Sequence, residues 1–148
     1  AGDGPNRCAL ETYAASLGLG ADRLRFLGEV DDTSPLYAWA DILVLTSDHE
    51  GTPNVILEAM AAGVPVIAMT VGGVPDLFSF GGGLLVRPGS DEMLAAAVTR
   101  LATDPAFADR LVEEGSRYLE RNHSLVSLGE QLTAVYTDAV ANRRGGRL

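Results

Sequence analysis

The sequence predicts an α/β fold, a three-layer Rossmann-like parallel sheet with helices on both faces. Segments with apolar residues at helical spacing alternate with short apolar runs, and the linkers between them are short. The run Ile42–Thr46 is apolar almost throughout, as is typical of a strand buried on both faces of a sheet. The length of 148 residues suits one domain, because domains average roughly 150 residues.

The N-terminal segment opens on a turn, Ala1–Pro5, that has the glycine and proline pattern of a strand-to-helix junction with no strand before it. We therefore expect the chain to be a fragment of something larger. Helical spacing then predicts a helix over Asn6–Leu17, and a short apolar run predicts a strand over Leu24–Leu27. A short helix is expected over Asp32–Ala40, with Ser34 as its cap.

After the strand at Ile42–Thr46, Thr52 and Pro53 have the pattern of an N-cap followed by proline at the first helical position. This helix is expected to end near Ala62, before Gly63. Two further strands, one turn and three helices are expected at Pro65–Met69, Leu84–Val86, Val71–Pro75, Ser90–Thr103, Pro105–Arg121 and Ser124–Asn142. Residues 1–142 would then form one partial domain and residues 143–148 a flexible tail.

Composition excludes several classes of protein. The net charge is −9, and all 11 cationic residues are Arg, so nucleic acid is not an expected partner. The single cysteine, Cys8, cannot form an intrachain disulfide. Gly63 and Pro65 interrupt the apolar stretch 59–71, so no transmembrane segment is expected. No His, Cys and carboxylate residues have metal-ligand spacing, so we expect no metal site. We expect a cytoplasmic protein, with peripheral attachment to the inner face of the membrane as an alternative for a full-length protein.

The loop and helix start at residues 48–58 carry the clearest chemistry, because ligands of parallel sheets bind beyond the carboxyl ends of the strands. Gly51 allows a ligand to approach the backbone closely. The N–H groups of about Asn54 and Val55 point out of the helix end, where a phosphate is favoured.

Two carboxylates flank this helix end. Glu58 follows Asn54 by one turn in an otherwise apolar helix, and a carboxylate there can accept hydrogen bonds from a ribose diol. Glu50 precedes the helix and can reach a hydroxylated group on the other side of a phosphate. This pattern suits a nucleoside diphosphate sugar. Spacing alone also allows an alternative interpretation, in which Glu50 complements the helix dipole and Glu58 lies on a solvated edge.

The block of residues 50–68, EGTPNVILEAMAAGVPVIA, resembles the signature of family 4 retaining glycosyltransferases. It is similar to the C-terminal, donor-binding half of their two-Rossmann GT-B fold, and the resemblance implies that the first strand and helix of that half are missing from this chain. Shorter matches follow the family's order over most of the chain; they lie at residues 2–5, 26–30, 40–41, 72–76 and 83–89.

The resemblance implies a role for each residue of the motif. Glu50 would bind hydroxyls of the donor sugar and is the candidate catalytic residue, and Glu58 would hold the nucleotide ribose. Gly28 and Val30 would border the nucleobase through their main chain. The sugar and diphosphate would be bound by the intervening segment, Gly51, Thr52, Pro53, Asn54 and Val55. No cofactor is implied, because the nucleotide sugar, such as a UDP- or GDP-sugar, is a substrate.

The chain also departs from the family pattern. The family's Arg and Lys that clamp the donor diphosphate lie before the Gly2–Pro5 turn, and this chain has no Lys. The N-terminal acceptor-binding domain is likewise absent from the sequence, and Asp76 stands where the family usually has Glu. We therefore expect this chain alone to bind the donor weakly and to transfer nothing.

Two other functions remain open: a sugar-nucleotide epimerase of the same fold, and a non-catalytic interaction module. Among the other residues, His49 is expected to have a loop or hydrogen-bonding role rather than that of a general acid. Tyr37 and Trp39 are expected in the core. The turn at 72–73 is expected to keep its backbone out of the crevice, and the glycines at 81–83 to form a flexible loop.

Overall fold

The computed structural model describes residues 1–145, with side chains through residue 137. The chain divides into two compact units, Ala1–Leu36 and the part from Tyr37 onward. The boundary between them falls within a short helix, α2 (Ser34–Trp39).

The first unit contains α1 (Arg7–Ser16), which confirms the first predicted helix to within a residue at either end. An isolated antiparallel bridge joins Gly2 to Gly28, with the Gly2 N–H donating to the Gly28 carbonyl over 2.6 Å. The strand expected at Leu24–Leu27 is wrong. These residues have no ladder, because no neighbouring strand pairs with them in the described part of the unit.

The helix α2 begins two residues later than expected, and Ser34 is its first residue rather than its cap. The Asp32 carboxylate accepts the Ser34 backbone N–H over 3.0 Å, so Asp32 performs the capping role. Hydrogen bonds from the Ser34 side chain and backbone lower the pKa of Asp32. Trp39 is 85% exposed, so its expected place in the core is wrong, whereas Tyr37 does pack on the core.

The second unit is built on a parallel sheet of β1 (Leu43–Leu45), β2 (Val66–Met69) and β3 (Leu84–Val86), in that order. Leu43 pairs with Val66, and Ile67 pairs with Leu84. The three strands were predicted from their apolar runs. Burial on both faces holds for the central strand β2, but β1 lies at the edge of this sheet and its Val44 is 39% exposed.

Alternate residues of β2 face two separate hydrophobic clusters. Val66 and Ala68 pack with Ile56 and Met60 of α3 (Asn54–Ala61) on one face. Ile67 packs on the other face with residues of α5 (Asp91–Thr103) and α6 (Pro105–Asn122), namely Leu101, Phe107 and Leu111. Helices therefore cover both faces of a parallel sheet, and the predicted fold class is confirmed.

Glycine ends α3 at the predicted place. Gly63 has φ +73°, its N–H donates to the Met60 carbonyl, and the next N–H, of Val64, donates to the Ala59 carbonyl. This is the Schellman arrangement, in which a left-handed residue satisfies the last carbonyls of a helix. The connection after β2 differs from the expected turn at Val71–Pro75. A short helix, α4 (Val74–Leu77), begins within this segment.

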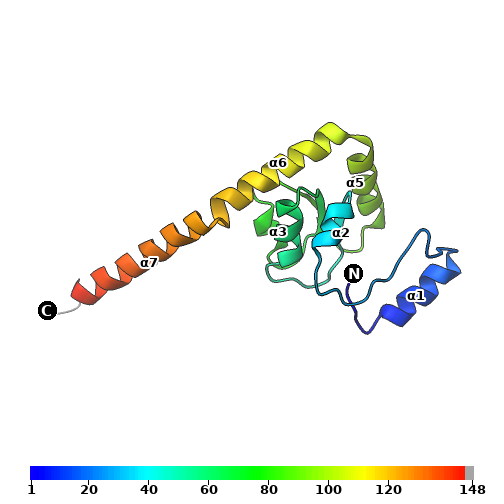
Figure 1. Cartoon of the computed structure of the whole chain (residues 1–148), viewed down its shortest axis with the longest axis horizontal. Helices are drawn as coiled ribbons and strands as arrows, with labels where there is room; N and C mark the ends of the chain where they lie inside the picture. Colours follow the sequence, from blue (N-terminus) through cyan, green and yellow to red (C-terminus); the bar gives the residue numbers. More distant parts are fainter. Residues whose placement is uncertain (146–148) are drawn as a thin grey trace. The chain divides into compact units, whose positions relative to one another are not determined.

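The last helix, α7 (Leu125–Gly145), extends beyond the predicted end at Asn142. It contacts α6 (Figure 1). The tail predicted for residues 143–148 starts inside this helix, and residues 146–148 lie outside the described residues. Large apolar side chains of α7 are between 48% and 87% exposed: Leu125, Val126, Leu128, Leu132, Val135 and Tyr136.

The glycines at 81–83 form a packed connection rather than the expected flexible loop. The Gly82 N–H donates to a carboxylate oxygen of Glu114 in α6 over 3.1 Å. A Cβ on Gly82 would lie 2.8 Å from the Cα of Gly115, so only glycine allows the loop to approach the helix this closely. This contact connects the start of β3 to α6.

A matched pair of N-cap residues gives a prediction about stability. The Asp104 side chain caps α6 by accepting the Phe107 N–H over 3.0 Å, whereas Ser90, at the same position of α5, makes no such bond. We expect Asp104→Ala to lower the free energy of unfolding by about 1 kcal/mol and Ser90→Ala to change it by less than about 0.5 kcal/mol. Urea unfolding monitored by circular dichroism measures both, and equal losses would contradict the assignment of the cap.

Candidate functional site

The candidate site lies where the chain leaves the carboxyl ends of the three parallel strands. β1 ends at Leu45, β2 at Met69 and β3 at Val86, so the connections that follow leave from the same edge of the sheet. Thr70 ties two of them together, because its backbone N–H and its hydroxyl both donate to the Val86 carbonyl, over 2.9 and 3.1 Å.

The loop after β2 presses against the loop after β1. A Cβ added to Gly72, which has φ +50°, would overlap the Glu50 carbonyl oxygen and lie 2.9 Å from the carbonyl carbon. A Cβ on Gly73 would lie 2.5 Å from the Gly51 carbonyl oxygen. The two glycines therefore let one loop support the backbone of the other, which is a more specific role than keeping the crevice open.

The helix α3 begins one residue later than the sequence predicts. Pro53 is its N-cap, with φ −73° and ψ 113°, so Thr52 is not the cap. Pro53 is buried, which fixes the entry of the chain into the helix. The N–H groups of Asn54 and Val55 belong to the first turn and have no acceptor within the helix. Such groups bind anions, and the positive end of the helix dipole adds to the attraction.

The two predicted carboxylates differ in their surroundings. Glu50 is half-buried in the loop before α3, and Glu58 is exposed on α3, one turn after Asn54. The Tyr37 hydroxyl donates to Oε2 of Glu58 over 2.9 Å and lies 3.4 Å from the Val55 carbonyl oxygen. The carboxylate of Glu58 is thus held at the surface by a side chain from α2.

The structure brings together part of the predicted set. Residues 50–55 form one continuous loop and helix start, and Glu58 lies on the helix that this segment opens. Gly28 and Val30 belong to the first unit, so their role at the nucleobase stays a prediction. The sequence reasoning missed the link from Tyr37 to Glu58. No spacing signals a contact across 21 residues, and the pairing depends on how α2 and α3 pack around the sheet.

Other chemistry is sparse in the part of the chain that the structure describes. No three side chains among His, Cys, Asp and Glu gather as a metal site would require. His49, next to Glu50, is exposed. No helix within the described residues combines the length and the apolar character that a membrane span needs.

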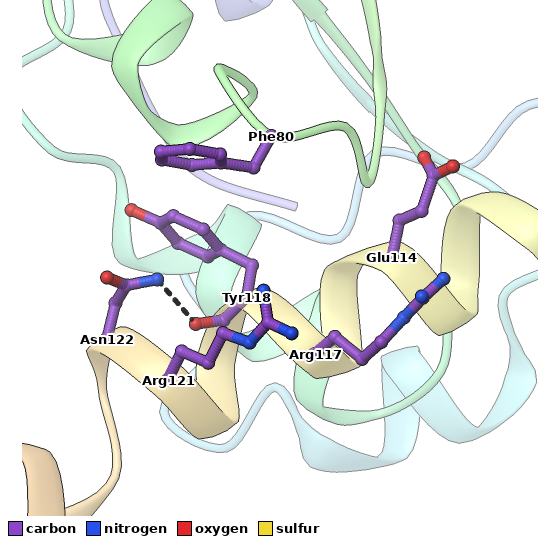
Figure 2. A pocket seen from close by; sticks show the side chains of 6 residues that line it. All are labelled: Phe80, Glu114, Arg117, Tyr118, Arg121 and Asn122. Carbon is purple, nitrogen blue, oxygen red and sulfur yellow. Dashed lines mark hydrogen bonds between the residues drawn. The ribbon is translucent and has the colours of Figure 1, made fainter.

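A separate hollow of about 420 Å³ lies along α6 (Figure 2). Six side chains line it: Phe80, Glu114, Arg117, Tyr118, Arg121 and Asn122. Within it, the Asn122 side-chain amide donates to the Tyr118 carbonyl over 2.9 Å. None of its lining residues is among the predicted site residues, so the hollow does not correspond to the site expected from the sequence.

Comparison with known proteins identifies relatives over nearly the whole chain. A family model described as glycosyl transferases group 1 matches residues 1–104. The lipopolysaccharide core biosynthesis glycosyltransferase LpsE of Rhizobium meliloti (strain 1021) is 37% identical over 144 residues. That alignment covers 96% of this chain and 41% of LpsE.

Solved structures agree with this result. Sucrose-phosphate synthase from Thermosynechococcus elongatus matches with a TM-score of 0.79 and 32% identity, over 94% of this chain and 35% of the synthase. Anabaena HepE in complex with UDP-glucose matches with a TM-score of 0.80 and 27% identity, over 93% of this chain and 39% of HepE. The chain therefore spans about two fifths of the length of these relatives.

Proposed function

Because this chain belongs to the group 1 glycosyl transferases, family 4 of the retaining glycosyltransferases, we propose that it binds the nucleoside diphosphate sugar donor of a hexosyl transfer reaction. It corresponds to the C-terminal Rossmann half of the GT-B structures that it matches. The observation that carries the proposal is the start of α3, whose first-turn N–H groups, of Asn54 and Val55, have no acceptor within the helix and stand in the sequence between Glu50 and Glu58. A UDP-sugar is the first donor to test, since HepE was crystallised with UDP-glucose.

In this proposal each part of the site binds one part of the donor. The N–H groups of Asn54 and Val55 face the diphosphate, and Gly51 lets the ligand approach the loop, because no atom lies within 4 Å of the position that a Cβ would take there. Thr52 and Pro53 complete this segment. Glu50 accepts hydrogen bonds from hydroxyls of the sugar, and Glu58 accepts those of the ribose diol. Fixed donors at the diphosphate would also stabilise the charge that develops there as the sugar leaves.

The partner proposed for the rest of the reaction is an acceptor-binding domain N-terminal to this chain. Such a domain would cover the exposed apolar side chains of α7, because removing apolar surface from water is energetically favourable. The identities of the acceptor, the sugar and the nucleotide depend on that domain and on the contacts that the donor makes.

The proposal is tested by calorimetric titration of this chain with UDP, GDP and uridine. We expect UDP or GDP to bind with a Kd of about 1 mM, which corresponds to −4.1 kcal/mol, and uridine to bind more weakly because it lacks the diphosphate. Absence of binding by either diphosphate at about ten times that concentration would favour the non-catalytic interaction module.

A second measurement separates the two enzyme classes. A full-length protein containing this chain is incubated with UDP-glucose, and the products are resolved by chromatography. The proposal predicts that UDP is released and the sugar appears on an acceptor. An isomerised UDP-sugar with no released UDP would identify an epimerase instead.

A further inference from the structure

The hydrogen bond between Tyr37 and Glu58 joins a side chain anchored in the core to a carboxylate at the surface. Tyr37 packs against the cluster formed by α3, β2 and α4, while its hydroxyl reaches Oε2 of Glu58 at 2.9 Å. Packing alone needs only the ring, which phenylalanine would also provide. The hydroxyl therefore has a separate consequence: it fixes where the Glu58 carboxylate lies on an otherwise exposed side chain.

We propose that Tyr37 is a positioning residue that holds the Glu58 carboxylate in place for the ribose hydroxyls of the donor, so that the site discriminates ribonucleotides from nucleotides lacking these hydroxyls. The inference rests on the proposed function, because it assigns the ribose to Glu58.

The physical reason is preorganisation. A glutamate side chain on a helix surface samples several rotamers, and binding a diol would require it to settle in one of them. A hydrogen bond from a ring held by the core selects that rotamer before the ligand arrives, so less conformational entropy is lost on binding. A carboxylate has about four lone-pair sites, and the hydrogen bond from Tyr37 uses one of those on Glu58.

The same hydroxyl also lies near the anion-binding end of the helix. Its oxygen is 3.4 Å from the Val55 carbonyl, in the first turn of α3, where the N–H of Val55 itself points out of the helix end. The Tyr37 hydroxyl thus contacts both Glu58, the residue proposed to bind the ribose, and the first turn of α3, which is proposed to face the diphosphate. Helix geometry sets the spacing of Val55 and Glu58, and Tyr37 fixes the side chain of Glu58 relative to that first turn.

The test compares two ligands and two proteins by calorimetry. UDP and 2′,3′-dideoxy-UDP are titrated into the wild-type chain and into Tyr37→Phe, which keeps the ring and its packing. We expect the substitution to weaken the binding of UDP about fivefold to tenfold and that of dideoxy-UDP less than about twofold, because only UDP offers ribose hydroxyls to Glu58. Tyr118→Phe is the matched control: Tyr118 packs on the same cluster, but its hydroxyl lies near His123, so both affinities should stay unchanged.

Each outcome decides between the claims. Equal losses for the two ligands, or no loss for either, would overturn the positioning role while leaving the proposed function intact. Failure of the wild-type chain to bind UDP would overturn the proposed function and this inference together. If Tyr37→Phe does not fold, as judged by its thermal melt, Glu58→Gln replaces it: the inference predicts a loss confined to UDP, and an equal loss for both ligands contradicts it.

Discussion

Replacing Gly72 by Ala is expected to weaken UDP binding at least tenfold and to lower the free energy of unfolding by about 3 kcal/mol. The added Cβ would overlap the Glu50 carbonyl oxygen, and neither backbone can withdraw as a flexible side chain would. Residue 72 also has φ +50°, a conformation that costs a residue with a Cβ about 1–2 kcal/mol. The loop that carries Glu50 and Gly51 would move away from the start of α3.

The control for this variant is Gly89→Ala. Gly89 has φ +74°, but no atom lies within 4 Å of the position that an alanine Cβ would take, so it shares the conformational cost without the overlap. We expect it to lose only about 1–2 kcal/mol and to bind UDP as the wild type does. Urea unfolding and calorimetry measure both variants. Similar UDP affinities for the two would show that contact between the loops does not shape the site.

Replacing Glu50 by Gln is expected to lower kcat/KM about 100-fold in a full-length transferase that contains this chain. A hydrogen bond accepted by a charged group contributes about 1.5–3 kcal/mol, and the sugar hydroxyls would lose it. In this chain alone, the variant should bind UDP-glucose no more tightly than UDP, while its affinity for UDP itself is unchanged. The affinity for UDP-glucose should fall and that for UDP should not, because Glu50 is assigned to the sugar and not to the nucleotide.

Asp48→Asn provides the comparison for Glu50→Gln. It removes the same charge from the same loop, but Asp48 is exposed whereas Glu50 is half-buried. We expect kcat/KM to change less than about threefold, since an exposed charge is largely screened by solvent and salt. Equal losses in the two variants would indicate a general effect of charge and would contradict the assigned role of Glu50.

Sequence patterns predicted most elements of the second unit because its local signals are strong and agree with one another. β2 reads as an apolar run and is buried on both faces, and Gly63 ends α3 where a left-handed residue is needed. The segment Leu24–Leu27 shows the limit of this reasoning. Its apolar run resembles a strand, but a strand also requires a partner, and none pairs with it in the described unit.

The candidate site was predictable where it is contiguous in sequence. Residues 50–58 form a loop and a helix start, so their relative placement follows from helix geometry. The contacts from Gly72 to Glu50 and from Tyr37 to Glu58 were not predictable, because each joins residues about 20 positions apart. They depend on strand order and on the packing of α2 against α3, which a single sequence does not encode as a local pattern.

The most direct test of the donor site is a map of backbone amide shifts in the ¹⁵N-labelled chain during titration with UDP. A donor site at the start of α3 predicts that the largest shifts occur at Gly51, Thr52, Asn54 and Val55, with smaller changes along α6. Shifts concentrated at the hollow around Phe80 and Tyr118, with residues 51–55 unmoved at saturating UDP, would contradict it.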